Sequence, residues 1–138
     1  MAQEHIDRLT GLDASSLARL REEVRAVRVS DAVRKYVADV VRATRTADGV
    51  ELGASPRAAL ALFRAAQAHA AIRGRAYVLP DDVKAQASAV LRHRLFLIAD
   101  AQMRGRTGAA VVADVLARTP VPAEDDHRGA APPGGRPP

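Results

Sequence analysis

The chain has 138 residues, a formal net charge of +5, and 48% hydrophobic but only 3% aromatic residues. This length suits one domain, and its core must come from Ala, Val and Leu, which suits closely packed helices. The absence of cysteine excludes disulfides and thiolate chemistry, and no apolar run is long enough to span a bilayer, so we expect a cytoplasmic protein.

The first part of the chain predicts two helices. Residues 1–11 are a polar lead-in, and a helix with one apolar face is predicted over 13–27. Residues 27–29 are a short extended candidate. Ser30 predicts the N-cap of a second helix that runs to about Arg45, because apolar residues then recur at helical spacing.

The middle of the chain predicts a loop followed by a long helix. Residues 46–52 contain an Asp-Gly turn signal. Ser55 predicts an N-cap, and Pro56 suits the first helical position because its missing N–H costs nothing there. The helix should run to about residue 73 and stop at Gly74. Because it is apolar on nearly every side, we expect it to be the buried centre of a bundle.

A second extended piece, residues 77–79, is expected to pair with residues 27–29. Pro80 starts a fourth helix, and Asp81 and Asp82 lie in its first turn, where negative charge is favourable for the helix dipole.

The remaining residues predict one more helix and a tail. Residues 96–106 are irregular or a helical extension, and Thr107 caps a last helix that ends near Pro120. Residues 121–138 are rich in Pro, Gly and charge, which predicts disorder. The fold class predicted is therefore all-α, a small helical bundle over 12–120 with at most a short two-stranded β pairing.

The sequence lacks the residues that catalysis needs. It contains no Gly-rich phosphate loop and no acidic metal ligands behind a strand. The histidines have no partner at metal-ligand spacing, so no metal site is expected, and His69 is expected to be a hydrogen-bonded core or boundary residue. We expect the isolated chain to catalyse nothing.

Arg57 is the candidate binding residue. It follows Ser55 and Pro56 at the positive end of a helix dipole, an unfavourable place for a cation. A phosphate suits both a helix N-terminus and a forked guanidinium, so this frame indicates an anion site. A solvated arginine on the shoulder of the helix is the alternative.

Several segments, in this order, resemble the C-terminal lid domain of MoxR-type AAA+ ATPases. They are Val27-Arg28-Val29-Ser30, Arg42-Ala43-Thr44-Arg45, Leu52-Gly53-Ala54-Ser55-Pro56-Arg57-Ala58, Gly74-Arg75-Ala76-Tyr77-Val78-Leu79-Pro80-Asp81-Asp82-Val83 and Val90-Leu91-Arg92-His93-Arg94-Leu95. The resemblance implies a helical lid that packs on a larger α/β nucleotide-binding core, which this chain does not contain.

The resemblance also implies roles for particular residues. Arg57 matches the sensor-2 arginine, which contacts the γ-phosphate of ATP, with Ser55 and Pro56 as its support. Arg45, Arg92 and Arg94 are candidates for interdomain or intersubunit contacts. For Arg45 we favour a helix-end role, in which a cation stabilises the carbonyl end of the dipole, and for Arg92 and Arg94 a solvated face is at least as well supported. The full-length enzyme would use ATP and Mg²⁺, which this chain alone would not bind.

Family membership would imply partners as well. MoxR-type ATPases form rings, and they are associated with chaperone-like maturation of partner proteins, often ones with von Willebrand A-type domains. One residue departs from the family pattern, because Leu79 stands where the family has Thr or Ser. The fourth helix therefore loses a side-chain N-cap, which we expect Asp82 to replace in part by reaching back to a free backbone N–H.

A basic helical nucleic-acid-binding domain, similar to a histone fold, is the alternative function. The net positive charge allows it. Scattering of the arginines among acids and the near absence of aromatic stacking residues disfavour it.

Overall fold

The computed structural model describes residues 13–123, so the predicted lead-in and all but the start of the predicted tail lie outside the described residues. The elements in chain order are α2 (Ala14–Ala26), α3 (Asp31–Ala43), the 3₁₀ helix η1 (Thr44–Thr46), β1 (Val50–Leu52), α4 (Pro56–Ile72), α5 (Pro80–Leu91), the 3₁₀ helix η2 (Arg92–Arg94), β2 (Phe96–Leu97), α6 (Ala99–Met103) and α7 (Gly108–Arg118). The predicted all-α class is confirmed.

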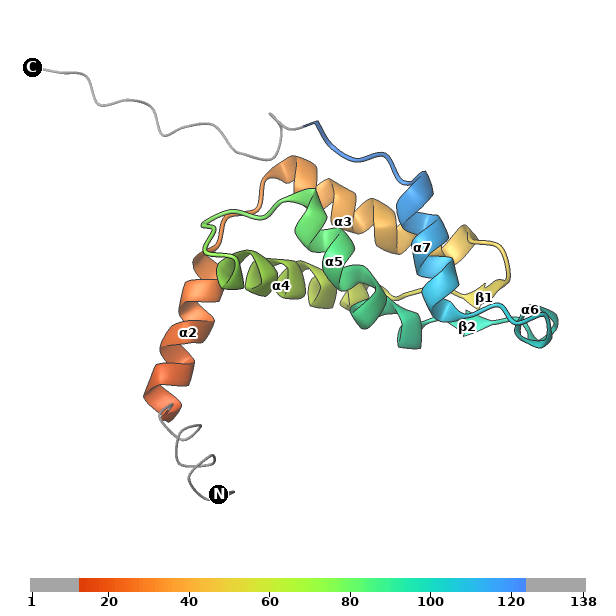
Figure 1. Ribbon diagram of the computed structural model, residues 1–138, viewed down its shortest axis with the longest axis horizontal. Coiled ribbons are helices and arrows are strands. Elements are labelled where there is room, and N and C mark those ends of the chain that lie inside the picture. The colour runs from red at the N-terminus through yellow and green to blue at the C-terminus, as the bar shows by residue number, and fades with distance from the viewer. Residues whose placement is uncertain (1–12, 124–138) are drawn as a thin grey trace, which may run out of the picture.

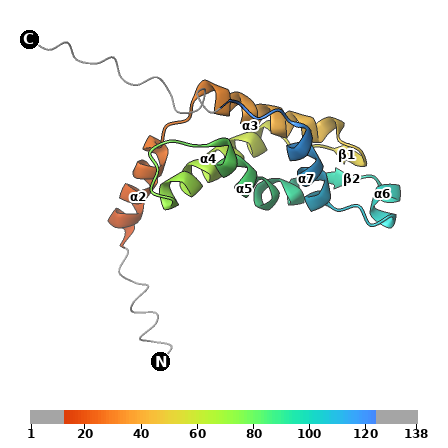
Figure 2. The same cartoon turned by 45° about the horizontal axis from the view of Figure 1, so that its top comes forward.

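The helices α3, α4, α5 and α7 form the body of the bundle, and α2 projects from one end of it (Figures 1 and 2). α4 and α5 run antiparallel, so the start of α4 and the end of α5 lie at the same end (Figure 1). The core is built mainly from Val, Ala and Leu, and its largest fully buried members include Tyr36, Leu62, Leu91, Val33 and Val40. Each fully buried Val or Leu contributes about 1.5–3 kcal/mol of hydrophobic free energy.

Side-chain caps start three of the helices. The Asp13 carboxylate accepts from the Ser16 N–H at 2.7 Å, and the Ser30 hydroxyl accepts from the Val33 N–H at 3.2 Å. Thr107 caps α7 in the same way, at 3.1 Å. These bonds satisfy N–H groups that have no partner inside the helix, which confirms the predicted helix starts.

The predicted pairing of residues 27–29 with residues 77–79 is confirmed, but it is limited to one bridge. Residues 27–29 and 77–79 meet in a single parallel bridge between Arg28 and Tyr77. The two-stranded sheet is instead β1 with β2, antiparallel, within the segments 46–52 and 96–106 that were predicted to be loop and irregular. Strands of three and two residues are too short to show an alternating pattern, and their pairing joins distant parts of the chain.

α4 is buried on one side only. Ala58, Leu62 and Ala66 face the core, whereas Leu60 is 57% exposed and Ile72 82% exposed. The predicted all-round burial is therefore wrong, although the helix does contact α2, α3 and α5. No helix in the described part of the chain has the length and apolarity needed to cross a membrane.

Candidate functional site

Arg57 is the second residue of α4 and is exposed. Ser55 occupies the N-cap position, but its hydroxyl makes no capping bond, which corrects the prediction. The reason is local. The Ser55 hydroxyl would have to accept a hydrogen bond from the Ala58 N–H, but that N–H already donates to the backbone carbonyl of Ser55 at 2.9 Å. Pro56 holds the first helical position as predicted, and it needs no partner there.

The loop that leads into α4 is anchored by a buried threonine. Thr44 and Ala54 are both fully buried. The Thr44 hydroxyl donates to the Val41 carbonyl at 2.6 Å and accepts from the Ala54 N–H at 2.9 Å. This side chain therefore ties the end of α3 to the residue just before the cap of α4, and it sets where the first turn of α4 begins.

A glycine and an arginine complete the anchor. A Cβ on Gly53 would lie 2.5 Å from the Cα of Arg45, closer than real Cβ atoms approach, so only glycine lets the two backbones meet. The Arg45 Nε then donates to the Ala54 carbonyl at 3.3 Å. Arg45 is thus a brace for the loop that carries Arg57, a role that sequence reasoning missed.

Thr44→Val should destabilise the chain and leave the loop less well held. The substitution keeps the shape but leaves the buried Ala54 N–H without its acceptor, which costs about 1–3 kcal/mol. Urea unfolding followed by circular dichroism measures the loss. Thr46→Val is the matched control, because Thr46 is exposed and should change stability by less than about 0.5 kcal/mol. Equal losses in the two variants would contradict the anchoring role.

The Arg57 guanidinium has no hydrogen bond or ion pair with any residue that the structure describes. It lies beside the positive end of the α4 dipole, where a cation is destabilised and an anion is stabilised. A free, permanently charged fork in this position is able to hold phosphate oxygens in a bidentate way. The arrangement therefore has the electrostatics of a candidate anion-binding site.

The other predicted arginines lie in the two 3₁₀ helices: Arg45 in η1, which follows α3, and Arg92 and Arg94 in η2, which follows α5. Arg92 is exposed, and its carbonyl lies against Gly108, where an added Cβ would approach to 2.3 Å. Arg94 is half-buried and donates through Nε to the Val90 carbonyl at 3.0 Å, so it braces the end of α5.

A buried carboxylate holds the far end of the α4–α5 hairpin. Asp82 is 1% exposed and accepts from Arg75 at 2.6 and 2.7 Å and from the Leu79 N–H at 2.7 Å. His69 Nδ1 lies 2.7 Å from the same carboxylate. The expected reach of Asp82 back to the backbone, and the hydrogen-bonded boundary place of His69, are confirmed. The convergence of Asp82, Arg75 and His69 on one point was missed.

Burial opposes ionisation of Asp82, but the hydrogen bonds from Arg75, the Leu79 N–H and His69 outweigh it and hold the pKa of this carboxyl below its ordinary value. The hydrogen bond between Arg75 and Asp82 also raises the pKa of Arg75. Asp82 and Arg75 therefore form an ion pair in which the carboxylate oxygens have hydrogen-bond partners. This pair fixes the start of α5, which lacks a Thr or Ser cap.

The arrangement matches that of a known structure. A crystal structure of a candidate ATPase from Cytophaga hutchinsonii superposes with a TM-score of 0.75 at 30% identity, over 79% of this chain and 36% of that one. The fold is thus that of a helical part within a larger protein.

Sequence comparison gives the family. The sequence profile of the AAA lid domain matches residues 42–115, and the chain belongs to that family. It is 38% identical over 105 residues to the uncharacterised protein YeaC of Bacillus subtilis, across 76% of this chain and 33% of YeaC. It is 42% identical over 99 residues to chaperone MoxR1 of Mycobacterium tuberculosis, across 65% of this chain and 26% of MoxR1. The chain spans between a quarter and a third of these relatives.

Proposed function

We propose that this chain is the lid of a MoxR-type AAA+ ATPase and that Arg57 is its sensor-2 arginine. The observation that supports this is the position of Arg57. Its guanidinium has no partner among the described residues and lies on the first turn of α4. The loop directly before that turn is held by Thr44, Gly53 and Arg45. Fixing the backbone before the arginine limits where its fork can reach, which a residue that binds phosphate in one geometry requires.

The chemistry follows from the charge. A guanidinium that binds the γ-phosphate offsets negative charge on the transferring group, and its contact is lost when that group leaves. The lid would thereby report hydrolysis as a change in how it sits on the core. The phosphate loop and the groups that hold Mg²⁺ would come from the nucleotide-binding core, and the described residues contain no cluster of His, Cys, Asp or Glu suited to a metal ion.

The proposal extends to assembly. Arg92, which is exposed, is our candidate for a contact with the core or with a neighbouring subunit of a ring. The side chains of Arg45 and Arg94 already donate to backbone carbonyls of this chain, those of Ala54 and Val90. Any contact that they make with another domain would come in addition to these hydrogen bonds. A von Willebrand A-type client and a cytoplasmic location are the remaining parts of this proposal.

Association with a separately expressed MoxR-type core tests the lid assignment. The chain should bind that core more tightly with ATP than without nucleotide, because Arg57 gains its anion only when the γ-phosphate is present. Analytical ultracentrifugation with ATP, with ADP and without nucleotide measures this. Binding that is the same in all three conditions, or no binding at all, would contradict the proposal.

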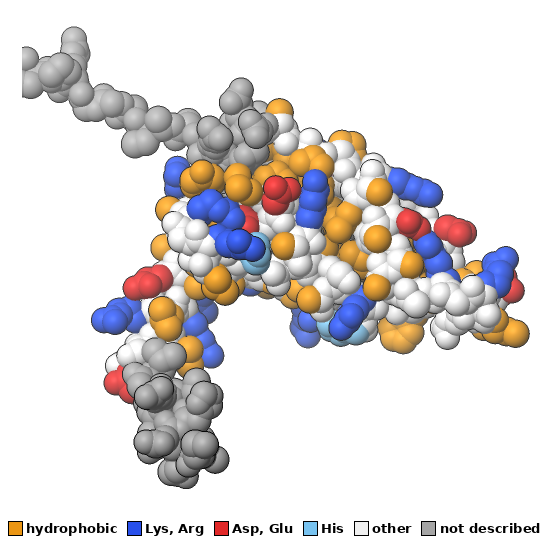
Figure 3. Space-filling model, in the orientation of Figure 1, with side chains coloured by type: hydrophobic (Ala, Val, Ile, Leu, Met, Phe, Trp, Pro, Cys, Tyr) orange, Lys and Arg blue, Asp and Glu red, His pale blue; other side chains and the backbone are white. Residues whose placement is uncertain are grey.

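The nucleic-acid alternative finds little support on the face drawn in Figure 3. There the Lys and Arg side chains stand singly or in small groups, with hydrophobic and acidic side chains between them. A duplex needs a continuous basic strip, since its affinity comes largely from phosphate contacts. Micromolar DNA binding near physiological salt, falling steeply as salt rises, would favour that alternative instead.

A further inference from the structure

A second cationic site lies where the connector between α2 and α3 crosses α4. A pocket of about 560 Å³ opens there, and the described residues that line it include no carboxylate. We call it the arginine pocket, after the four arginines that line it: Arg25, Arg28, Arg34 and Arg64. It belongs to neither the Arg57 site nor the Asp82 ion pair.

The floor of the arginine pocket is a buried amide. Gln67 is 3% exposed, and its Nε2 donates to the Val27 carbonyl at 2.8 Å and to the Arg25 carbonyl at 3.3 Å. Its Oε1 accepts from Arg64 at 3.2 Å. Gln67 therefore ties the connector to α4 and orients the Arg64 guanidinium without neutralising it.

The other guanidiniums are also held mostly by neutral groups. Arg34 donates through Nε to the Val29 carbonyl at 3.2 Å. Arg28 has an exposed side chain, while its backbone makes the bridge to Tyr77. Among the described residues, Arg25 alone of these four arginines has an acidic partner, Glu22, at 2.8 Å. Like charges gathered around one opening repel, and an anion that enters relieves that repulsion.

Two aromatic side chains line the pocket, Phe63 and Tyr77, and the ring of Phe63 is already covered. The Cζ atoms of Arg34 and Arg64 each lie 5.8 Å from the centroid of the Phe63 ring, within cation–π range. These contacts leave the ring poorly placed to stack on a nucleobase. What the pocket offers a ligand is guanidinium forks, which match carboxylates and phosphates.

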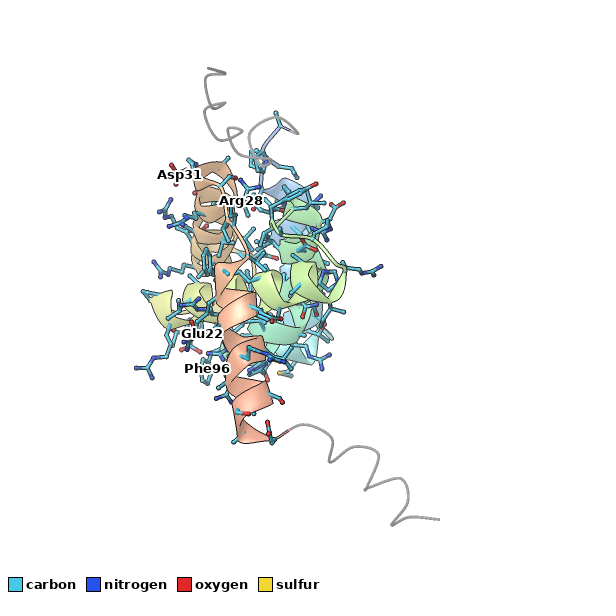
Figure 4. The ribbon with its side chains drawn as sticks, turned by 90° about the vertical axis from the view of Figure 1, so that its left-hand side faces the viewer. Glu22, Arg28, Asp31 and Phe96 are labelled. Carbon is cyan, nitrogen blue, oxygen red and sulfur yellow. The ribbon has the colours of Figure 1, made fainter. Side chains whose placement is uncertain are left out.

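The cationic zone is short. Figure 4 shows Arg28 with Asp31 on one side of it and Glu22 on the other. A long nucleic acid strand that continued past the pocket would run over these carboxylates, whereas only a few acidic side chains of a peptide need to lie within the pocket. The opening is also much larger than one phosphate needs. We propose that the arginine pocket binds a short carboxylate-rich peptide segment of a partner protein.

Fluorescence anisotropy with a rhodamine-labelled Glu-Ala repeat octapeptide tests this. The chain should bind it, and Arg28→Ser should weaken binding about tenfold, because one charge-assisted contact is lost. Arg19→Ser is the matched control, since it removes the same charge from an exposed site outside the pocket, and it should weaken binding less than twofold. Circular dichroism should show both variants folded, since both side chains are exposed.

Four outcomes would overturn the proposal. The first is an equal loss of peptide affinity in Arg28→Ser and Arg19→Ser, which would show that the pocket is not the binding site. The second is binding of a Gln-Ala octapeptide with the same affinity as the Glu-Ala octapeptide, which would show that the carboxylates are not recognised. The third is displacement of the peptide by equimolar phosphate or single-stranded DNA. The fourth is binding that appears only after residues 124–138 are deleted, which would mean that the chain's own Glu124-Asp125-Asp126 run occupies the pocket.

Discussion

The sensor-2 role proposed for Arg57 predicts that Arg57→Ala, made in a protein that joins this lid to a nucleotide-binding core, lowers ATP hydrolysis by about tenfold to a hundredfold while the fold stays unchanged. The lost group is a charged hydrogen-bond donor to phosphate, worth about 1.5–3 kcal/mol, and each 1.4 kcal/mol is a factor of ten in rate. The fold should survive because Arg57 is exposed and contacts no charged partner among the described residues. Steady-state phosphate release at saturating ATP measures the effect.

Two further variants sharpen this result. Arg57→Lys keeps the charge but loses the fork, so it should recover only part of the activity. Arg73→Ala removes an exposed arginine at the other end of the same helix, and it should hydrolyse ATP at the wild-type rate. Wild-type turnover in Arg57→Ala would sink the sensor role, and an equal loss in Arg73→Ala would make it a general charge effect.

Asp82→Asn should destabilise the chain by about 3 kcal/mol at pH 7. Removing one partner of a buried ion pair leaves the other uncompensated, and here the variant also weakens the cap of α5 and the contact to His69. Asp81→Asn is the matched control on the neighbouring residue, whose side chain is 85% exposed, and it should change stability by less than about 0.5 kcal/mol. Urea unfolding at pH 7 measures both variants.

Lowering the pH should reduce the difference in the free energy of unfolding between the wild type and Asp82→Asn. The carboxyl of Asp82 has a lowered pKa in the folded chain and its ordinary value of 3.8 when unfolded, so the unfolded state takes up the proton first. The stability that Asp82 contributes is therefore fully present well above pH 3.8 and is lost as the pH falls through the folded value. A gap that stays constant from pH 7 to pH 3 would show that charge is not the source of the stability.

The main helices, and the place of Arg57 in the first turn of one of them, were accessible from sequence because their signals are local. Ser30 and Thr107 lie at caps, and Gly74 takes the positive φ of +74° that ends a helix. Such bonds join residues a few positions apart, so a single sequence displays them. The same reasoning failed at Ser55, because the Ala58 N–H donates to the backbone carbonyl of Ser55 and not to its hydroxyl.

The bracing of the site was not accessible, because it joins residues that are distant in the chain. Thr44 reaches Ala54 ten residues away, and Gln67 reaches Val27 forty residues away. Nothing local marks Thr44 as an anchor rather than one more member of an apolar stripe. Gly53 was visible as a glycine, but the reason for it, the close approach of Arg45, appears only when the loop is folded.

By itself, then, the sequence determined an all-α bundle, the approximate boundaries of its longer helices and an arginine at the start of α4, since periodicity, caps and breakers act within one or two turns. Only the tertiary structure decided which cations are paired and which are free. Arg75 is neutralised by Asp82, whereas Arg57 has no such partner among the described residues and four arginines surround one opening. Charge compensation depends on distances across the fold, and those distances are set by packing rather than by spacing along the chain.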